Sequence, residues 1–228
     1  MNLNFLKYQK GFLYLWFILL LLGSGSLFGQ QTPTISLIDI DNEYLIGKNY
    51  LQVLPDPKGE FTIRQVSSSG FRSKFTNDVS IKDGVKAYWV KISTKATLQH
   101  EKDWVMGFEP WDSIKLYYKN PKYKDFTEND VKKTGASLPM SKRDVGLSLD
   151  REHPFLTLPI LNNTRQTFYI RLSGAPHFSP KISPTLYSRA YILETKRVDK
   201  YVQGLHLGFI LTMVLYTTCS PNTVNYYW

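Results

Sequence analysis

Hydrophobic and polar residues alternate in the middle of the chain, in short segments separated by turn residues. Alternate side chains of a β-strand point to opposite faces of a sheet, so a period of two predicts half-buried strands. The pattern covers Glu60–Val66, Ala87–Thr94, Asp103–Phe108, Asp112–Lys119 and Gln166–Leu172. Two further strands are expected, a buried one in the apolar run Pro154–Ile160 and a last one over Ser183–Tyr187. No stretch between Pro33 and Tyr187 keeps a helical period over three turns, although Glu128–Lys133 fits one short helical turn. Short alternating strands of this spacing predict an all-β antiparallel sandwich or barrel over residues 30–188.

The pattern also predicts which side chains form the core. One face of each strand should be buried, and the residues on those faces are Tyr88, Val90, Ile92, Trp104, Met106, Phe108, Ile114, Leu116, Tyr118, Phe168, Ile170 and Leu172. The last segment is expected to be an edge strand because Pro184 has no N–H to donate to a neighbouring strand.

The N-terminus has the organisation of a secretory signal peptide. Lys7 and Lys10 precede eleven residues without a polar break, Phe12–Leu22, and small residues follow up to Gly29. The apolar run is shorter than the ~20 residues that a membrane span needs. We therefore expect residues 1–29 to be a signal peptide, with an uncleaved N-terminal anchor as the alternative.

A second apolar stretch lies near the C-terminus. We expect a connecting helix over residues 189–201 and an incomplete first transmembrane helix over residues 202–219, followed by an aberrant tail at 220–228. Eighteen residues at ~1.5 Å per residue give about 27 Å, near the minimum for spanning a bilayer. The alternative is a C-terminal helix packed against the soluble domain.

Charge and composition narrow the function. The chain has 228 residues and a formal net charge of +9, which removal of Lys7 and Lys10 with the signal peptide lowers to +7. A basic surface suggests an anionic partner, but export excludes nucleic acid. Cys219 is the single cysteine, so the chain cannot form an internal disulfide or a multi-cysteine metal site. The four histidines show no metal-ligand spacing, and no nucleophile-elbow, zinc-protease, P-loop or dinucleotide motif is present. We expect no enzymatic activity, no cofactor and no metal.

The strand faces opposite the predicted core, which we expect to be solvated, carry the candidate ligand-binding residues; burial of Trp89 by a flanking loop is an alternative. Each of three strands pairs an aromatic side chain with a cation on that face, and the residues are Trp89, Lys91, Lys115, Tyr117, Tyr169 and Arg171. Aromatic planes stack on sugar rings or apolar ligands, and Lys or Arg binds carboxylate or sulfate. The alternative is that these amphipathic side chains only cover apolar surface.

Four stretches carry a resemblance to a known family. They are Ala87–Ser93, Trp111–Tyr118, Thr134–Arg143 and Thr167–Leu172, in that order. They resemble the extracellular sensor domain (type 2) of bacterial seven-transmembrane receptors with diverse intracellular signalling modules. The resemblance implies a jelly-roll sandwich similar to carbohydrate-binding modules. In that family a first membrane span resembling Gly204–Tyr216 follows the sensor domain.

The chain departs from the family pattern after Tyr216, where a full member would continue through six more spans to an output domain. We therefore expect a truncated or frame-shifted product, or a fragment.

These observations predict an exported ectodomain, periplasmic or extracellular, attached to the inner membrane. Its expected role is ligand sensing for a receptor, with a carbohydrate or another small molecule as ligand. The expected partners are this ligand and the membrane, which the C-terminal helix would contact. A second copy of the chain, forming a homodimer, is a further possible partner. The alternatives are an anchored or secreted adhesion or carbohydrate-binding module without signalling output, and an exported hydrolase.

Overall fold

The computed structural model of the chain describes residues 33–38, 42–98, 103–119, 126, 131–145, 153–176 and 181–219. The chain divides into two units, residues 1–33 and 34–228, and all described residues except Pro33 belong to the second unit. The signal peptide expected over residues 1–29 and the tail expected over 220–228 lie outside the described residues.

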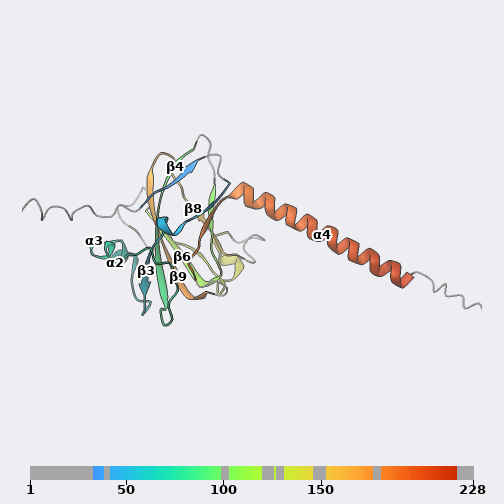
Figure 1. Cartoon of the computed structure of the whole chain (residues 1–228), viewed down its shortest axis with the longest axis horizontal. Helices are drawn as coiled ribbons and strands as arrows, with labels where there is room; N and C mark the ends of the chain where they lie inside the picture. Colours follow the sequence, from blue (N-terminus) through green and yellow to red (C-terminus); the bar gives the residue numbers. More distant parts are fainter. Residues whose placement is uncertain are drawn as a thin grey trace, which may run out of the picture. The chain divides into compact units, whose positions relative to one another are not determined.

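Six of the described strands form a large sheet (Figure 1). Its order is β1-β4-β9-β6-β7, and β3 pairs with β4 beside β1. The bounds are β1 Ile35–Ile38, β3 Gln52–Asp56, β4 Ala87–Thr97, β6 Trp111–Tyr118, β7 Lys132–Thr134 and β9 Arg165–Pro176. Within this sheet β1 runs parallel to β4 and the other pairs are antiparallel. The long strands β4, β9 and β6 lie side by side and form its centre.

Four strands form a small sheet in the order β2-β10-β5-β8, with antiparallel pairing throughout. The bounds are β2 Glu43–Leu45, β5 Trp104–Gly107, β8 Phe155–Leu158 and β10 Thr185–Ser188. The expectation that the last strand lies at an edge was wrong, because β10 pairs with both β2 and β5. Pro184 precedes the strand, so its missing N–H interrupts neither pairing, and its carbonyl accepts the N–H of Ile46 at 3.3 Å.

The two sheets share one hydrophobic core. The inward side chains predicted from the alternation all belong to it, eleven of them buried and Tyr118 partly buried against them. The cluster draws on both sheets, for example Val90 and Ile170 from the large sheet and Met106 and Leu186 from the small one. The architecture is therefore two antiparallel-rich sheets that do not close into a barrel.

The predicted strand over Glu60–Val66 was wrong. This segment contains the short helix α2 (Ile63–Ser67), and α3 (Ser69–Arg72) follows it. Thr62 and Gln65 form a capping box, in which the N–H of Gln65 binds the Thr62 hydroxyl and the N–H of Thr62 binds the Gln65 side chain. Ile63 and Val66 are both buried at a spacing of three, which a short window of alternation does not separate from a strand.

Several short elements carry too little pattern to be predicted. They are β1, β2 and β3, the 3-10 helices η2 (Lys48–Tyr50) and η3 (Met140–Lys142), and β7. β7 occupies the C-terminal end of the segment for which a helical turn was expected, and that expectation was wrong for Lys132 and Lys133. Its sequence, Lys-Lys-Thr, shows no alternation of apolar residues, so its conformation follows from pairing with β6.

A single helix, α4 (Arg189–Cys219), follows β10 directly and joins the expected connecting and C-terminal helices (Figure 1). Its start is fixed to the small sheet, because Ile192 packs with Val105 and Phe155 and the N–H of Arg189 donates to Asp103 O at 2.8 Å. From Leu205 onward its apolar side chains are exposed.

The membrane span expected over residues 202–219 is not supported by the hydropathy of α4. Among the described residues, no helix combines the length and the apolar character needed to cross a membrane. Gln203, His206 and the threonines near the end of the helix dilute its apolar residues.

Candidate ligand-binding face

All six candidate residues lie together on the outer face of the large sheet, which is the face opposite the shared core. The strand register arranges them in two rows across β4, β9 and β6. One row is Trp89, Arg171 and Lys115, and the other is Lys91, Tyr169 and Tyr117. The sequence pattern therefore identified side chains that the fold brings into contact.

The aromatic members of this face are buried rather than open to solvent. Trp89 is 1% exposed, Tyr117 is 3% exposed and Tyr169 is 5% exposed. They form a second hydrophobic cluster whose other buried members are Leu54, Ile63, Val66 and Phe75. The segment containing α2 and α3 thus supplies apolar side chains that cover the rings. The expectation that these aromatic residues lie on a solvated face was wrong.

The rings pack on one another in a defined way. The rings of Trp89 and Tyr117 lie 5.4 Å apart, across the central strand β9. The ring centroid of Tyr169 lies 6.2 Å from that of Phe75 and 5.1 Å from that of Phe126, which it meets edge to face. Such pairs stabilise the cluster beyond simple burial, so the rings form a packed cluster beside the cations of this face.

A tight turn holds the covering segment on the sheet. The buried carboxylate of Asp56 accepts hydrogen bonds from the backbone N–H groups of Gly59, Glu60 and Phe61, at 2.8, 3.1 and 2.9 Å. The carbonyl of Gly59 in turn accepts a 2.7 Å hydrogen bond from Nη2 of Arg171. One member of the candidate face therefore also anchors the turn.

Lys91 lies in a partly buried, positively charged environment. Its Nζ donates to Oε1 of Gln52 at 3.1 Å and lies 5.8 Å from the ring centroid of Phe75. Burial lowers the pKa of Lys91 from its ordinary value, and repulsion from Arg72 and Arg165 lowers it further. Burial also raises the pKa of the Tyr169 hydroxyl, although Arg72 opposes this shift. Positive charge is therefore concentrated around this end of the face.

Two donors of this face have no hydrogen-bond partner among the described residues. They are Nε1 of Trp89 and Nε of Arg171, which are both buried and belong to directly opposed residues of β4 and β9.

Lys133 belongs to the same face, although no pattern in the sequence indicated this. Lys133 lies opposite Lys115 because β7 pairs with β6, and β7 was not predicted.

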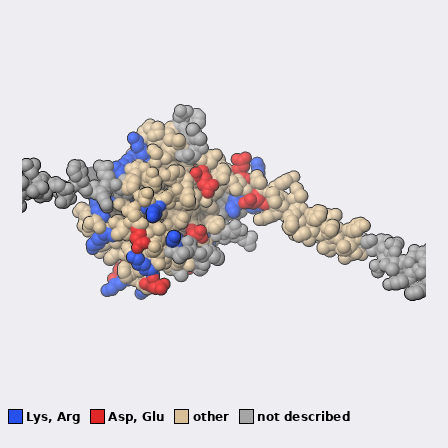
Figure 2. All heavy atoms as spheres, in the orientation of Figure 1, with Lys and Arg blue, Asp and Glu red and all other residues tan. Residues whose placement is uncertain are grey.

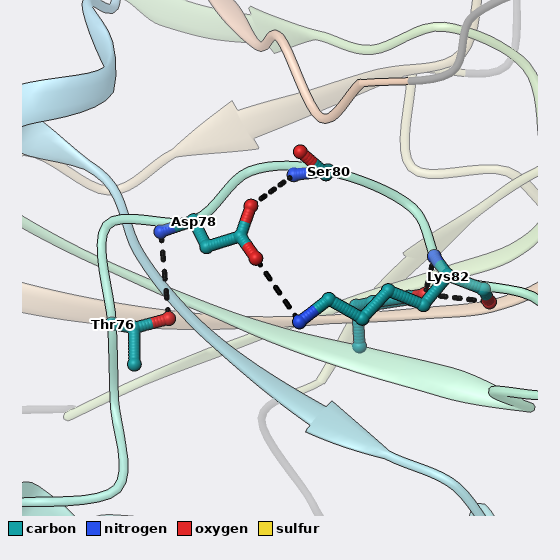
Figure 3. A network of polar contacts seen from close by, with 5 residues as sticks. Thr76, Asp78, Ser80 and Lys82 are labelled. Atoms are coloured by element: carbon teal, nitrogen blue, oxygen red, sulfur yellow. Dashed lines mark hydrogen bonds and ion pairs between the residues drawn. The ribbon is translucent and has the colours of Figure 1, made fainter.

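Among the described residues, the carboxyl group with the clearest pKa shift belongs to a structural turn instead. Asp78 accepts a hydrogen bond from the N–H of Ser80 at 3.1 Å and pairs with Lys82 at 3.0 Å (Figure 3). The hydrogen bond from Ser80 and the contact with Lys82 lower the pKa of Asp78 to about 2. The Tyr88 hydroxyl accepts from Lys82 N and donates to Lys82 O, which ties this turn to β4. No three His, Cys, Asp or Glu side chains in the described ranges are grouped as a metal site requires.

The surface charge agrees with a basic face. Figure 2 shows one side of the molecule, on which Lys and Arg side chains gather along the part of the domain where Figure 1 places α2 and α3. Lys58, Arg64, Arg72 and Lys74 lie on this segment, and the Lys74 ammonium lies 4.2 Å from the Phe71 ring centroid.

The model of one protein family, described as 7TMR-DISM extracellular 2, matches residues 48–183. The match contains every residue of the candidate face, from the turn after β3 to the end of β9. No curated protein matches the chain.

Proposed function

This chain belongs to the 7TMR-DISM extracellular 2 family, and we propose that it is the ligand-sensing ectodomain of a bacterial membrane receptor. The family places the domain outside the cytoplasm, in an extracellular or periplasmic position. The observation that carries the proposal is that the family match coincides with a sheet face on which aromatic side chains and cations alternate. The proposed role is recognition rather than catalysis.

The proposed ligand is a carbohydrate or a related small molecule. The two-sheet architecture suits a jelly roll of the carbohydrate-binding kind, in which a sheet face presents the ligand site. On this chain the half-buried cations Lys91, Lys115 and Arg171 are partly open to solvent, while the rings beside them are buried. A ligand would therefore first contact the cations, and access to the rings would require movement of the segment bearing α2 and α3.

Signal transfer is proposed to run through α4. β10 continues into α4 without a break, and Ile192 packs the first turn of the helix on the small sheet. A ligand can bias the position of α4 only if it binds two arrangements of the domain with different affinity. The exposed apolar side chains between Leu205 and Tyr216 are the proposed contact with the inner membrane.

A binding experiment on the full chain tests the ligand proposal. The chain would be titrated with a panel of neutral and acidic glycans by calorimetry, alongside Lys91→Ala and the control Lys200→Ala, an exposed lysine on α4. We expect at least one glycan to bind, and Lys91→Ala to weaken it while Lys200→Ala does not. Absence of binding across the panel would contradict carbohydrate sensing.

Hydrogen exchange separates sensing from adhesion. If a bound glycan changes the protection of amides in the first turns of α4, the sensing proposal is supported. If a glycan binds and protection of α4 is unchanged, the adhesion module is the better description.

A further inference from the structure

We propose that the outer face of the large sheet binds an oxyanion, a carboxylate or sulfate group, at a row of three cations: Arg171, Lys115 and Lys133. This inference rests on the proposed sensing function and deepens it, because it makes an acidic ligand the preferred one.

The row is fixed by the backbone register. Arg171 on β9 lies directly opposite Lys115 on β6, and Lys115 lies directly opposite Lys133 on β7. Directly opposed side chains on one sheet face have Cβ atoms about 4.5–5.5 Å apart, and like charges at that spacing repel. We therefore expect three cations on three neighbouring strands to repel one another in the ligand-free fold.

Neighbouring carboxylates do not relieve this repulsion in the described part of the chain. Arg171 bonds to a carbonyl, that of Gly59, and no described ion pair involves Lys115 or Lys133. Lys132 makes an informative contrast, because its ammonium lies 3.5 Å from the carboxylate of Asp144. Of two consecutive lysines, one is neutralised within the fold and the other joins the cation row.

The deep end of the row also lacks acceptors. Nε of Arg171 and Nε1 of the opposed Trp89 are buried donors without a hydrogen-bond partner in the described structure. Buried N–H groups are nearly always paired, and an unpaired donor costs stability. A carboxylate or sulfate group supplies the acceptor oxygens that these donors lack and the negative charge that the cation row lacks.

Exposure along the row indicates the direction of approach. Lys133 is exposed, Lys115 and Arg171 are half-buried, and Trp89 is buried. An anionic group would therefore approach from the β7 side, and it would reach the buried donors at the β4 side only if the segment bearing α2 and α3 moves.

The test compares an acidic sugar with its neutral counterpart. The full chain would be titrated with galacturonate, galactose and inorganic sulfate by calorimetry. We expect galacturonate to bind about tenfold or more tightly than galactose, the scale of one charge-assisted hydrogen bond. Lys115→Gln and Lys133→Gln should each remove most of that preference, and the matched control Lys132→Gln should not.

A measurement without ligand keeps the test independent of the choice of sugar. The double variant Lys115→Gln/Lys133→Gln should raise the Tm of the ligand-free chain because it removes the repulsion, whereas Lys132→Gln should lower it through loss of the pair with Asp144. Added sulfate should raise the Tm of the unmodified chain and not that of the double variant.

The outcomes distinguish this inference from the sensing proposal. Equal binding of galacturonate and galactose, unchanged in the lysine variants, overturns the anion site and leaves carbohydrate sensing intact. Binding of sulfate at the row without binding of any glycan supports the anion site and contradicts carbohydrate sensing. No response to galacturonate or sulfate overturns the anion site.

Discussion

The turn that follows β3 depends on one buried carboxylate, and replacing it should destabilise the domain. Asp56 is 1% exposed, and its two oxygens accept three backbone N–H bonds at 2.8, 3.1 and 2.9 Å. Asp56→Ala removes all three acceptor contacts, and the amides regain water only if the turn opens. A net contribution near 1 kcal/mol per hydrogen bond gives a loss of about 3 kcal/mol in the free energy of unfolding.

A graded series makes this prediction specific. Asp56→Asn keeps an oxygen that can accept from Gly59 and Glu60, but it replaces the acceptor of the Phe61 N–H with a donor. We expect Asp56→Asn to cost about 1–2 kcal/mol, between the unmodified chain and Asp56→Ala. Asp83 is an exposed aspartate in a nearby turn, and Asp83→Ala should change stability by less than ~0.5 kcal/mol.

Urea denaturation of the full chain at neutral pH, followed by tryptophan fluorescence, measures all three variants. The midpoint should fall in the order unmodified, Asn, Ala, with similar m-values. A loss below ~0.5 kcal/mol for Asp56→Ala, or equal losses for the Ala and Asn variants, would refute the assignment of the stabilisation to these hydrogen bonds.

Three further predictions concern the backbone, the pH response and the start of α4. Gly135 has φ 131° and an added Cβ would lie 2.5 Å from a backbone oxygen of β6, so Gly135→Ala should lower the free energy of unfolding by about 2 kcal/mol or more in a urea titration; an unchanged midpoint would contradict this. The backbone amide of Ser80 and the ammonium of Lys82 lower the pKa of Asp78 to about 2. An NMR titration should therefore give a pKa near that value for Asp78, and Lys82→Ala should move this pKa toward 3.8. Because this pKa is depressed in the folded state, the stabilisation that it reports is present above pH 3.8 and is lost as pH falls toward 2, and a midpoint near 3.8 in the unmodified chain would exclude it. Ile192→Ala should cost about 2–4 kcal/mol because its side chain is buried against the small sheet, whereas Leu193→Ala, 49% exposed, should cost less than 1 kcal/mol; equal losses in thermal unfolding would show that α4 packs on another face.

Alternation in the sequence was sufficient to predict the centre of the fold. The strands β4, β5, β6, β8, β9 and β10 all fall within or overlap the predicted segments. Their inward residues, such as Val90 and Ile170, form the shared core. This succeeded because each strand buries one face, and a period of two is the direct record of that burial in the sequence.

The candidate face was only half predictable. Alternation placed Trp89 and Arg171 opposite the core, and the structure shows them directly opposed on β4 and β9. It did not reveal that the rings are buried, because the residues that cover them lie in α2, α3 and the turn at Asp56. That segment carries a short apolar spacing which fits a strand and a helix equally well.

Two predictions failed, that the last strand lies at a sheet edge and that the C-terminal helix spans a membrane. The position of β10 depends on which strands pair with it, and Pro184 restricts only its own N–H. For α4, the run of apolar residues predicted the helix, but its polar residues leave it short of the apolar character of a span.

The sequence by itself determined the strand faces, the family and the residue types of the candidate face, because these follow from local period and order. Only the tertiary structure decided which cations become neighbours. Lys133 joins Lys115 and Arg171 through the pairing of β7, β6 and β9, which are far apart in the chain. The closeness of these three residues is a property of strand register, and no local pattern of residues records it.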